Sequence, residues 1–375
     1  MTPIRVLHAP EMVAGNAPEL ARAERRIGLK SWCVSFERSR YGYEVDEILF
    51  AAADGAITRE IKRLRLLARA LRRYDVVHFN FGSTFLPIAR LDGGGEGAER
   101  LYNTYARLVQ LRDLPLLKAA GKGIVMTYQG DDARQGDVLR AQFDIHPADE
   151  AESEYYTPIS DEGRRERIAF VARYADKIYS LNPDLLHVLP LGAEFLPYSH
   201  IDIDSVRPRP PNRRLDHVRI LHAPSLRSVK GTRHVISAVE SLKEQGLPVE
   251  LALVEGLSHD QALREYAKAD LVVDQLLYGW YGGFAVEAMA LGKPVVAYIR
   301  PEDLEWVPRE MRDSLPIINA NAHSLEQVLM EWVTIRRDEL ADVGELSRAF
   351  VEAWHRPTSV AERTRATYQQ ILKAR

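Results

Sequence analysis

The chain has 375 residues, 46% of them hydrophobic, and a formal net charge of -3 at pH 7. The length favours two α/β domains over one, and the nearly balanced charge argues against nucleic acid as a partner because it creates no field that attracts a polyanion. The single cysteine, Cys33, cannot form an internal disulfide, and no apolar segment resembles a signal peptide or a membrane span, so we expect a cytoplasmic protein.

Short apolar segments alternate with longer segments of helical period, a pattern typical of parallel sheets built from strand–helix–strand units. The predicted strands of the first half are residues 4–7, 31–36, 76–79, 123–128 and 177–180. Those of the second half are 218–221, 249–254, 271–274 and 294–298. The fold class is therefore α/β, and each half can form its own doubly wound sheet.

A basic amphipathic helix is predicted at 57–73. Its apolar residues Ile61, Leu64, Ala68 and Leu71 share one helical face. The surrounding basic residues are Arg59, Lys62, Arg63, Arg65, Arg69, Arg72 and Arg73. Two interpretations stay open: the helix packs on its sheet with a solvated basic face, or it rests on anionic lipid at the inner face of the membrane and makes the protein peripheral there.

Prolines and arginines between 206 and 215 disfavour both helix and burial, which predicts a linker at 201–216 between domains at 1–200 and 217–356. The sequence RVLHAP at 5–10 returns as RILHAP at 219–224, as expected either of two related first strands or of chance. Helical spacing in the tail breaks at Arg356–Pro357. We therefore expect the last segment, 357–375, to cross back over the first domain.

Two cations follow the predicted strand at 218–221. Arg227 and Lys230 lie just before a helical segment at 234–244. Because free N–H groups at a helix N-terminus already favour anions, these side chains could hold a diphosphate from two sides. The alternative is a solvated basic loop with Thr232 as an ordinary helix cap.

A pair of glycines, Gly282 and Gly283, precedes a helical segment that carries Glu287. Glycines let backbone N–H groups approach a ligand, and a carboxylate at the start of the helix can accept two hydrogen bonds from a vicinal diol such as ribose. Alternatively, Glu287 is only a charge near a helix N-terminus.

The run FAVEAMALGKPVV at 284–296, preceded by Lys230-Gly231-Thr232, resembles the donor-binding half of retaining glycosyltransferases of family 4. The resemblance implies the GT-B fold: two Rossmann-like domains facing each other across a cleft, with an acceptor-side N-terminal domain and a nucleotide-sugar donor-binding C-terminal domain. It implies that Arg227 and Lys230 bind the donor diphosphate and that Glu287 binds the ribose, and these three are the catalytic candidates. The implied further donor contacts are Gly15, Asn16, Glu255, Gly256, Leu257, Tyr281, Gly282, Gly283 and Phe284.

Three positions depart from the family pattern. Gly279 stands where the family has a first Glu, so Asp274, Gln275 or Tyr281 could make the contacts to the donor sugar instead. Arg227 is closer in sequence to Lys230 than in the commonest version of the motif. Gln129 replaces a sugar-contacting His; an amide can bind a hydroxyl but cannot act as a base. Candidates for the acceptor or transferred sugar are Gln129, Gly130, Asp131, Asp132 and Arg134. The last three could equally form a surface salt-bridge cluster.

The resemblance predicts transfer of a hexosyl group, with retention of configuration, from a UDP- or GDP-linked sugar to a hydroxyl of a glycan, a lipid-linked or a small-molecule acceptor. No permanently bound cofactor is expected, and no metal, because the sequence has no paired-Cys, His-Glu-x-x-His or P-loop motif. The alternatives are an epimerase or phosphorylase of the same fold, and a nucleotide-sugar-binding protein without transferase activity.

Overall fold

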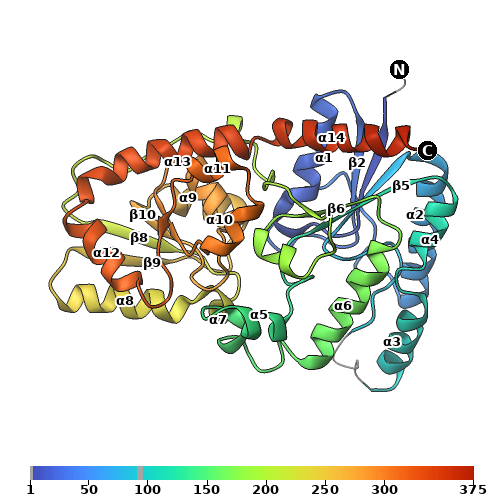
Figure 1. Ribbon diagram of the computed structural model, residues 1–375, viewed down its shortest axis with the longest axis horizontal. Coiled ribbons are helices and arrows are strands. Elements are labelled where there is room, and N and C mark those ends of the chain that lie inside the picture. The colour runs from blue at the N-terminus through green and yellow to red at the C-terminus, as the bar shows by residue number, and fades with distance from the viewer. Residues whose placement is uncertain (1–2, 91–95) are drawn as a thin grey trace.

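The computed structural model describes residues 3–90 and 96–375, which form two parallel sheets side by side (Figure 1). The N-terminal sheet has the strand order β3-β2-β1-β4-β5-β6-β7. Its strands are β1 Arg5–Ala9, β2 Lys30–Ser35, β3 Glu47–Ile48, β4 Val76–Asn80, β5 Gly123–Tyr128, β6 Lys177–Ser180 and β7 Glu194–Phe195. The C-terminal sheet has the order β12-β11-β10-β8-β9. Its strands are β8 Val218–His222, β9 Val249–Leu253, β10 Leu271–Val273, β11 Val295–Ala297 and β12 Ile318–Asn319.

Helices pack around both sheets (Figure 1). Those of the first half are α1 Asn16–Arg26, α2 Ala56–Arg73, α3 Ala98–Val109, α4 Asp113–Ala119, α5 Gly136–Gln142 and α6 Pro158–Ala172. Those of the second half are α7 Arg227–Lys230, α8 Thr232–Glu244, α9 His259–Tyr266, α10 Gly283–Ala290, α11 Arg309–Asp313, α12 Leu325–Thr334, α13 Leu340–Trp354 and α14 Pro357–Lys373. Short 3₁₀ helices occur at Val13–Gly15, Pro147–Asp149, Pro183–His187, Ile203–Ser205, Pro301–Trp306 and Arg337–Glu339.

The prediction of two doubly wound sheets is confirmed. All the predicted strands form, with ends that differ by at most two residues. Strands β3, β7 and β12 were not predicted, because two residues are too few to show an apolar pattern. The order of strands reverses between β1 and β4 in one sheet and between β8 and β10 in the other. In open α/β sheets ligands bind at such points, beyond the carboxyl ends of the strands.

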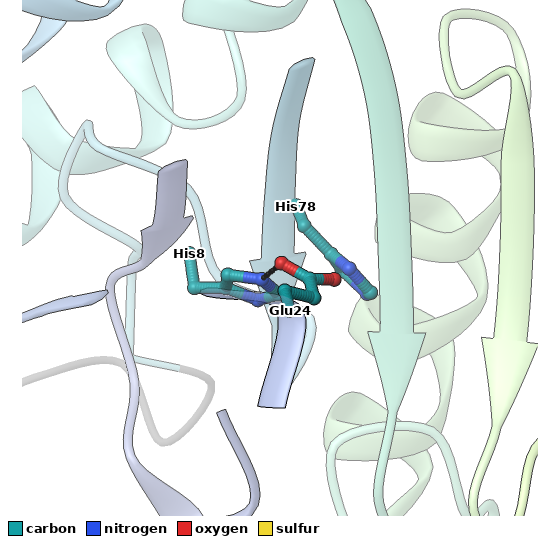
Figure 2. Close-up of side chains that lie close together, drawn as sticks. All are labelled: His8, Glu24 and His78. Carbon is teal, nitrogen blue, oxygen red and sulfur yellow. Dashed lines mark hydrogen bonds and ion pairs between the residues drawn. The ribbon is translucent and has the colours of Figure 1, made fainter. Parts of the chain in front are cut away.

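The C-terminal helix crosses back to the first domain as predicted: α13 ends at Trp354, and α14 packs on α1 (Figure 1). A buried hydrogen-bond network holds it there, centred on Glu24 of α1. This carboxylate accepts hydrogen bonds from Thr364 and Tyr368 of α14, at 2.9 and 2.8 Å, and lies 2.8 Å from His8 of β1. Figure 2 shows His8 and Glu24 converging with His78 of β4, whose Nδ1 is 2.7 Å from the Tyr368 hydroxyl.

The predicted helix at 57–73 forms as α2, but only part of its predicted apolar face packs on the sheet, where Leu71 contacts the core. Leu66, Leu67 and Ala70 pack on the sheet with the core of the first domain. Ile61 and Leu64 are instead 44% and 54% exposed. The adjacent leucines give the helix a second apolar stripe, and burying two large side chains at one level removes more apolar surface from water.

Candidate functional site

The loops that follow the strands of the two sheets meet at the interface between the domains. The backbone N–H of His259, at the start of α9, donates to the carbonyl of Tyr41 from the N-terminal half, at 2.9 Å. The guanidinium of Arg134, after β5, lies 4.0 Å from the ring centroid of Tyr278, after β10. This is the side on which Rossmann-like sheets place ligands, so we place the candidate site here.

Glu287 lies inside this interface. Gly283 begins α10, and Glu287 follows about one turn later with only 4% of its surface exposed. Its Oε1 is 2.9 Å from Nε2 of His259 and 3.3 Å from Nε2 of His200. Burial would raise the pKa of this carboxyl, but the contacts with His200 and His259 outweigh burial and hold the pKa at about 2. Glu287 is therefore an ionised, buried acceptor.

A segment of the N-terminal half, residues 39–46, reaches across the interface to this carboxylate; we call it the strap. The Tyr43 hydroxyl donates to Oε1 of Glu287 at 3.3 Å, and its ring centroid is 4.6 Å from that of His259. On the other side, a Cβ added to Gly15 would lie 2.7 Å from Cδ1 of Tyr43. Tyr43 thus fills the space between Gly15 and Glu287, two residues predicted to bind the donor.

Lys230 points inward beside the glycine pair. Its Nζ donates to Oε1 of Gln275, and the backbone N–H of Gly282 donates to Oδ2 of Asp274 at 2.6 Å. A Cβ on Gly282 would lie 3.6 Å from Nζ of Lys230. Burial lowers the pKa of Lys230 and raises that of Asp274. One cation and the first N–H groups of α10 therefore converge on the same place, with Asp274 as the local counter-charge.

Arg227 does not share this place. It is exposed, and its Nε donates to Oε1 of Glu255, after β9, at 2.9 Å. Together with Lys230 it forms the single turn of α7, and α8 starts at Thr232, two residues earlier than the predicted helix at 234–244. The two side chains have different partners: Lys230 donates to Gln275 inside the interface, whereas the exposed Arg227 pairs with Glu255. Gly256, in the same loop as Glu255, has φ +68°, and Leu257 packs against the core.

The residues after β5 form a buried cluster. Nε of Arg134 donates to Asp184 at 2.6 Å, and both side chains are almost completely buried. The Asp131 carboxylate accepts hydrogen bonds from the hydroxyls of Tyr155 and Tyr156, at 2.5 and 2.7 Å. The alternative of a surface salt-bridge cluster is therefore wrong for Arg134, which is stacked on Tyr278 and paired inside the protein.

Asp132 closes the turn at the end of β5. It accepts hydrogen bonds from the backbone N–H groups of Gln129 and Gly130, at 3.0 and 2.7 Å. Burial raises its pKa to about 7 in spite of these bonds. The side-chain amide of Gln129 donates to Oδ1 of Asn80 at 3.3 Å, and the backbone carbonyl of Gln129 accepts from the side-chain amide of Asn182 at 2.7 Å. This turn is held by its own side chains at the carboxyl edge of the sheet.

Some residues predicted to bind the donor have other roles. Tyr281 is fully buried, and its hydroxyl is 2.8 Å from Nε2 of His355 in the core; its contact with a donor stays a prediction. The Asn16 side chain accepts a hydrogen bond from the backbone N–H of Ser199 and is buried. Phe284 packs on Tyr266, with ring centroids 4.7 Å apart.

Gly279, at the position of the missing first Glu, leaves no room for a side chain. Its φ is +81°, and an added Cβ would lie 2.8 Å from Cζ of Arg300. Arg300 is buried, paired with Asp303 at 3.0 Å, and stacked over Phe143 of the N-terminal half at 3.6 Å. A buried arginine therefore takes the volume that a longer residue at position 279 would need.

Sequence reasoning missed Tyr43, His200, His259, Asp184 and Tyr278. None of these residues belongs to a motif with a characteristic spacing; Tyr43, His200 and Tyr278 lie in loops, and His259 and Asp184 lie in the first turns of short helices. Only the position of Asp184, directly after β6, and of Tyr278, after β10, could have drawn attention, because loops after strands line such sites.

A cavity of about 330 Å³ opens next to α2, at the carboxyl ends of β1 and β2. Glu11, Phe36, Arg59 and Arg63 are among its lining residues, and burial raises the pKa of Glu11. The Arg63 guanidinium lies 4.1 Å from the ring centroid of Phe36. A larger cavity, of about 660 Å³, lies beside α14 and the amino end of β6, at the opposite edge of the sheet from the candidate site.

Among the described residues, His8, Glu24 and His78 form the one group whose ligand atoms could surround a metal ion, all within 4.8 Å of one another (Figure 2). Both nitrogens of His78 and both oxygens of Glu24 already have hydrogen-bond partners. Burial lowers the pKa of His78 to about 3, so it is neutral. We interpret the group as a structural network that fastens α14.

No helix within residues 3–90 and 96–375 combines the length and the apolar character needed to cross a bilayer.

No family model and no curated protein sequence matches the chain. The chain is similar in structure to the catalytic domain of starch synthase IV from Arabidopsis thaliana bound to ADP and acarbose, with a TM-score of 0.61 and 12% identity over 99% of this chain and 100% of that one. It is also similar to Anabaena Alr3699/HepE in complex with UDP-glucose, with a TM-score of 0.60 and 12% identity over 98% and 100%. A Listeria monocytogenes protein described as a UDP-N-acetylglucosamine 2-epimerase gives a TM-score of 0.52 and 13% identity over 97% and 95%. The similarity establishes the fold: the chain has the GT-B architecture of two Rossmann-like domains.

Proposed function

We propose that the protein transfers a sugar from a nucleoside-diphosphate sugar to an acceptor hydroxyl. The observation that carries this proposal is the position of Glu287, an ionised and buried carboxylate about one turn into α10, whose N-cap residue Gly282 lies beside Lys230. A diol-binding carboxylate on a helix whose N-terminus lies beside a cation suits a ribose linked to a diphosphate. Nucleotides bound to HepE and to starch synthase IV add support by analogy of fold.

In this proposal the C-terminal domain, 217–356, holds the donor. Lys230 and the N–H groups at the start of α10 neutralise the charge that develops on the leaving diphosphate. Glu287 accepts hydrogen bonds from the ribose hydroxyls once Tyr43 moves away from it. Arg227 would have to release Glu255 to reach the phosphates, so we assign it a secondary role. The loop of Glu255, Gly256 and Leu257 would lie beside the base.

The acceptor binds to the N-terminal domain in this proposal. That domain comprises residues 1–200 and 357–375, and residues 201–216 link it to the C-terminal domain. The turn at 129–134 and the cavity beside α2 face the acceptor. We propose retention of configuration. The acceptor oxygen bonds to the anomeric carbon on the face from which the diphosphate leaves, the bond from that carbon to the phosphate oxygen breaks, and the leaving phosphate takes the acceptor proton. Gln129 can then orient a sugar hydroxyl without acting as a base.

Two other functions remain as outcomes of the same test. An epimerase would use the same donor site and need no acceptor. A binding protein without transferase activity is favoured by Gly279, which leaves no side chain for the donor sugar, and by Gln129.

The test is incubation with UDP- and GDP-linked hexoses, with and without a pool of hydroxyl acceptors, followed by mass spectrometry and by NMR of the anomeric proton. A new glycoside with the donor's anomeric configuration is expected. Lys230→Ala should lower turnover by at least about a hundredfold, as loss of one oxyanion-stabilising group does. Lys243→Ala, an exposed lysine on α8, is the matched control. A loss smaller than about tenfold in both Lys230→Ala and Arg227→Ala contradicts the proposal.

A further inference from the structure

Helices α2 and α3 expose apolar side chains on the outer side of the N-terminal domain, away from the C-terminal domain (Figure 1). On α2, Ile57, Ile61 and Leu64 follow each other at helical spacing, and Ile57 is 79% exposed. On α3, Leu101 and Leu108, two turns apart, are 74% and 71% exposed. Five aliphatic side chains on two helices are more than the isolated exposed residues that any protein surface carries.

Two tyrosines join these side chains into one surface. The hydroxyls of Tyr102 and Tyr105 of α3 donate to Glu60 of α2, at 2.7 and 3.0 Å. Glu60 lies one turn before Leu64 and next to Ile61, so the tyrosine hydroxyls reach α2 beside its exposed apolar residues. We call this surface the α2–α3 face. Amphipathic aromatic side chains of this kind suit the boundary between water and lipid.

Positive charge surrounds the α2–α3 face. Helix α2 carries seven basic residues and one acidic residue, Glu60, in a chain whose net charge is -3. Several of its cations form ion pairs, among them Lys62 with Asp54 and Arg69 with Glu47. The exposed arginines without an ion-pair partner in the part of the chain that the structure describes are Arg65, Arg72 and Arg73 of α2 and Arg100 and Arg107 of α3. Glu99 is the one acidic residue of α3.

We propose that the α2–α3 face docks on an anionic lipid bilayer. The aliphatic residues and tyrosines would enter the interfacial region, and the unpaired arginines would bind lipid phosphates. A second copy of the chain fits this surface less well, because self-association through the same face would bring the unpaired arginines of both copies together.

Membrane docking would also bring a lipid-linked acceptor close to the protein. The cavity at the carboxyl ends of β1 and β2 is lined by Arg59 and Arg63, which belong to α2. A helix that rests on lipid would therefore hold this cavity, on the sheet side of α2, about one helix diameter from the bilayer surface, where the head group of a lipid-linked acceptor lies. This second step rests on the proposed transferase function, whereas membrane docking does not.

The experiment is co-sedimentation of the full chain, without donor or acceptor, with vesicles of phosphatidylcholine alone or of phosphatidylcholine and phosphatidylglycerol in equal parts. Binding is expected only to the anionic vesicles and should weaken with added salt. Arg65→Gln with Arg72→Gln should lower the partition coefficient about twenty-five-fold, since each arginine near such a surface contributes about fivefold. Ile57→Ser with Leu108→Ser should lower it at least about tenfold.

The matched control is Ile335→Ser with Leu346→Ser, two exposed aliphatic residues of the C-terminal half, which should change nothing. All four arginine and aliphatic positions are exposed, so the variants should keep the wild-type unfolding midpoint. Equal binding to neutral and anionic vesicles, or unchanged binding in both variants, overturns the proposal. The proposal is also overturned if light scattering shows that the wild-type protein is a dimer and that the same substitutions dissociate it. The vesicle experiment does not depend on the transferase assay: failure of either one leaves the conclusion from the other unchanged.

Discussion

Replacing Glu287 by glutamine keeps the shape of the side chain and removes its charge. In the wild-type protein the carboxylate is buried and lies within 2.9 Å of His259 and 3.3 Å of His200. An amide at this position can still accept a hydrogen bond, but it loses the attraction between a carboxylate and the two imidazoles. The substitution therefore tests both the electrostatics of the interface and the proposed ribose contact.

The size of the effect follows from the pKa of Glu287, which is lowered from 4.5 to about 2 in the folded protein. A shift of that size favours the ionised, folded form by about 3 kcal/mol. Because the folded pKa is the lower one, this contribution is present above about pH 4.5 and is lost as the pH falls toward about 2. Glu287→Gln should therefore lower the free energy of unfolding by up to about 3 kcal/mol near neutral pH, and by much less near pH 3.

The assays are urea unfolding at about pH 6 and about pH 3, and titration with UDP and GDP by calorimetry. Loss of charge-assisted hydrogen bonds to ribose should weaken nucleotide binding at least about tenfold. Glu240→Gln, an exposed carboxylate on α8, is the matched control and should stay within about 0.5 kcal/mol of the wild type. A stability change as small as that of the control at both pH values would refute the electrostatic reasoning. Unchanged binding of both nucleotides would refute the assignment of the ribose contact.

Three further substitutions test other parts of the structure. Tyr368→Phe removes the hydroxyl that bonds to Glu24 and His78, so urea unfolding should show a loss of about 1–3 kcal/mol; an unchanged midpoint would mean that the network does not fasten α14. His259→Gln should cost most stability below pH 6.5, because its bond with Glu287 outweighs burial and raises its pKa, and the difference from wild type should shrink as the pH rises past that value. Gly279→Ala should destabilise by more than about 1 kcal/mol, since it combines a positive φ with a contact of 2.8 Å to Arg300; thermal unfolding equal to that of the wild type would show that the site can relax.

The sequence predicts those parts of the fold and of the site that depend on neighbouring residues. Strands and helices appear as local apolar periodicities, so both sheets and the break at Arg356–Pro357 were predictable. The start of α10 at the glycine pair fixes Glu287 about one turn into the helix, whatever the rest of the chain does. The place of Lys230 is fixed locally too, because this residue lies between the end of β8 and the start of α8.

Only the tertiary structure decides which distant residues meet. Tyr43 contacts Glu287 from 244 positions away in the chain, and His200 reaches it from the end of the N-terminal half. The sequence gives no local signal for such contacts, because they depend on how two sheets and their loops dock. The orientation of α2 is also decided by the tertiary structure, because its two apolar stripes have similar local patterns. Leu66, Leu67 and Ala70 pack in the core, and Ile61 and Leu64 are exposed to solvent.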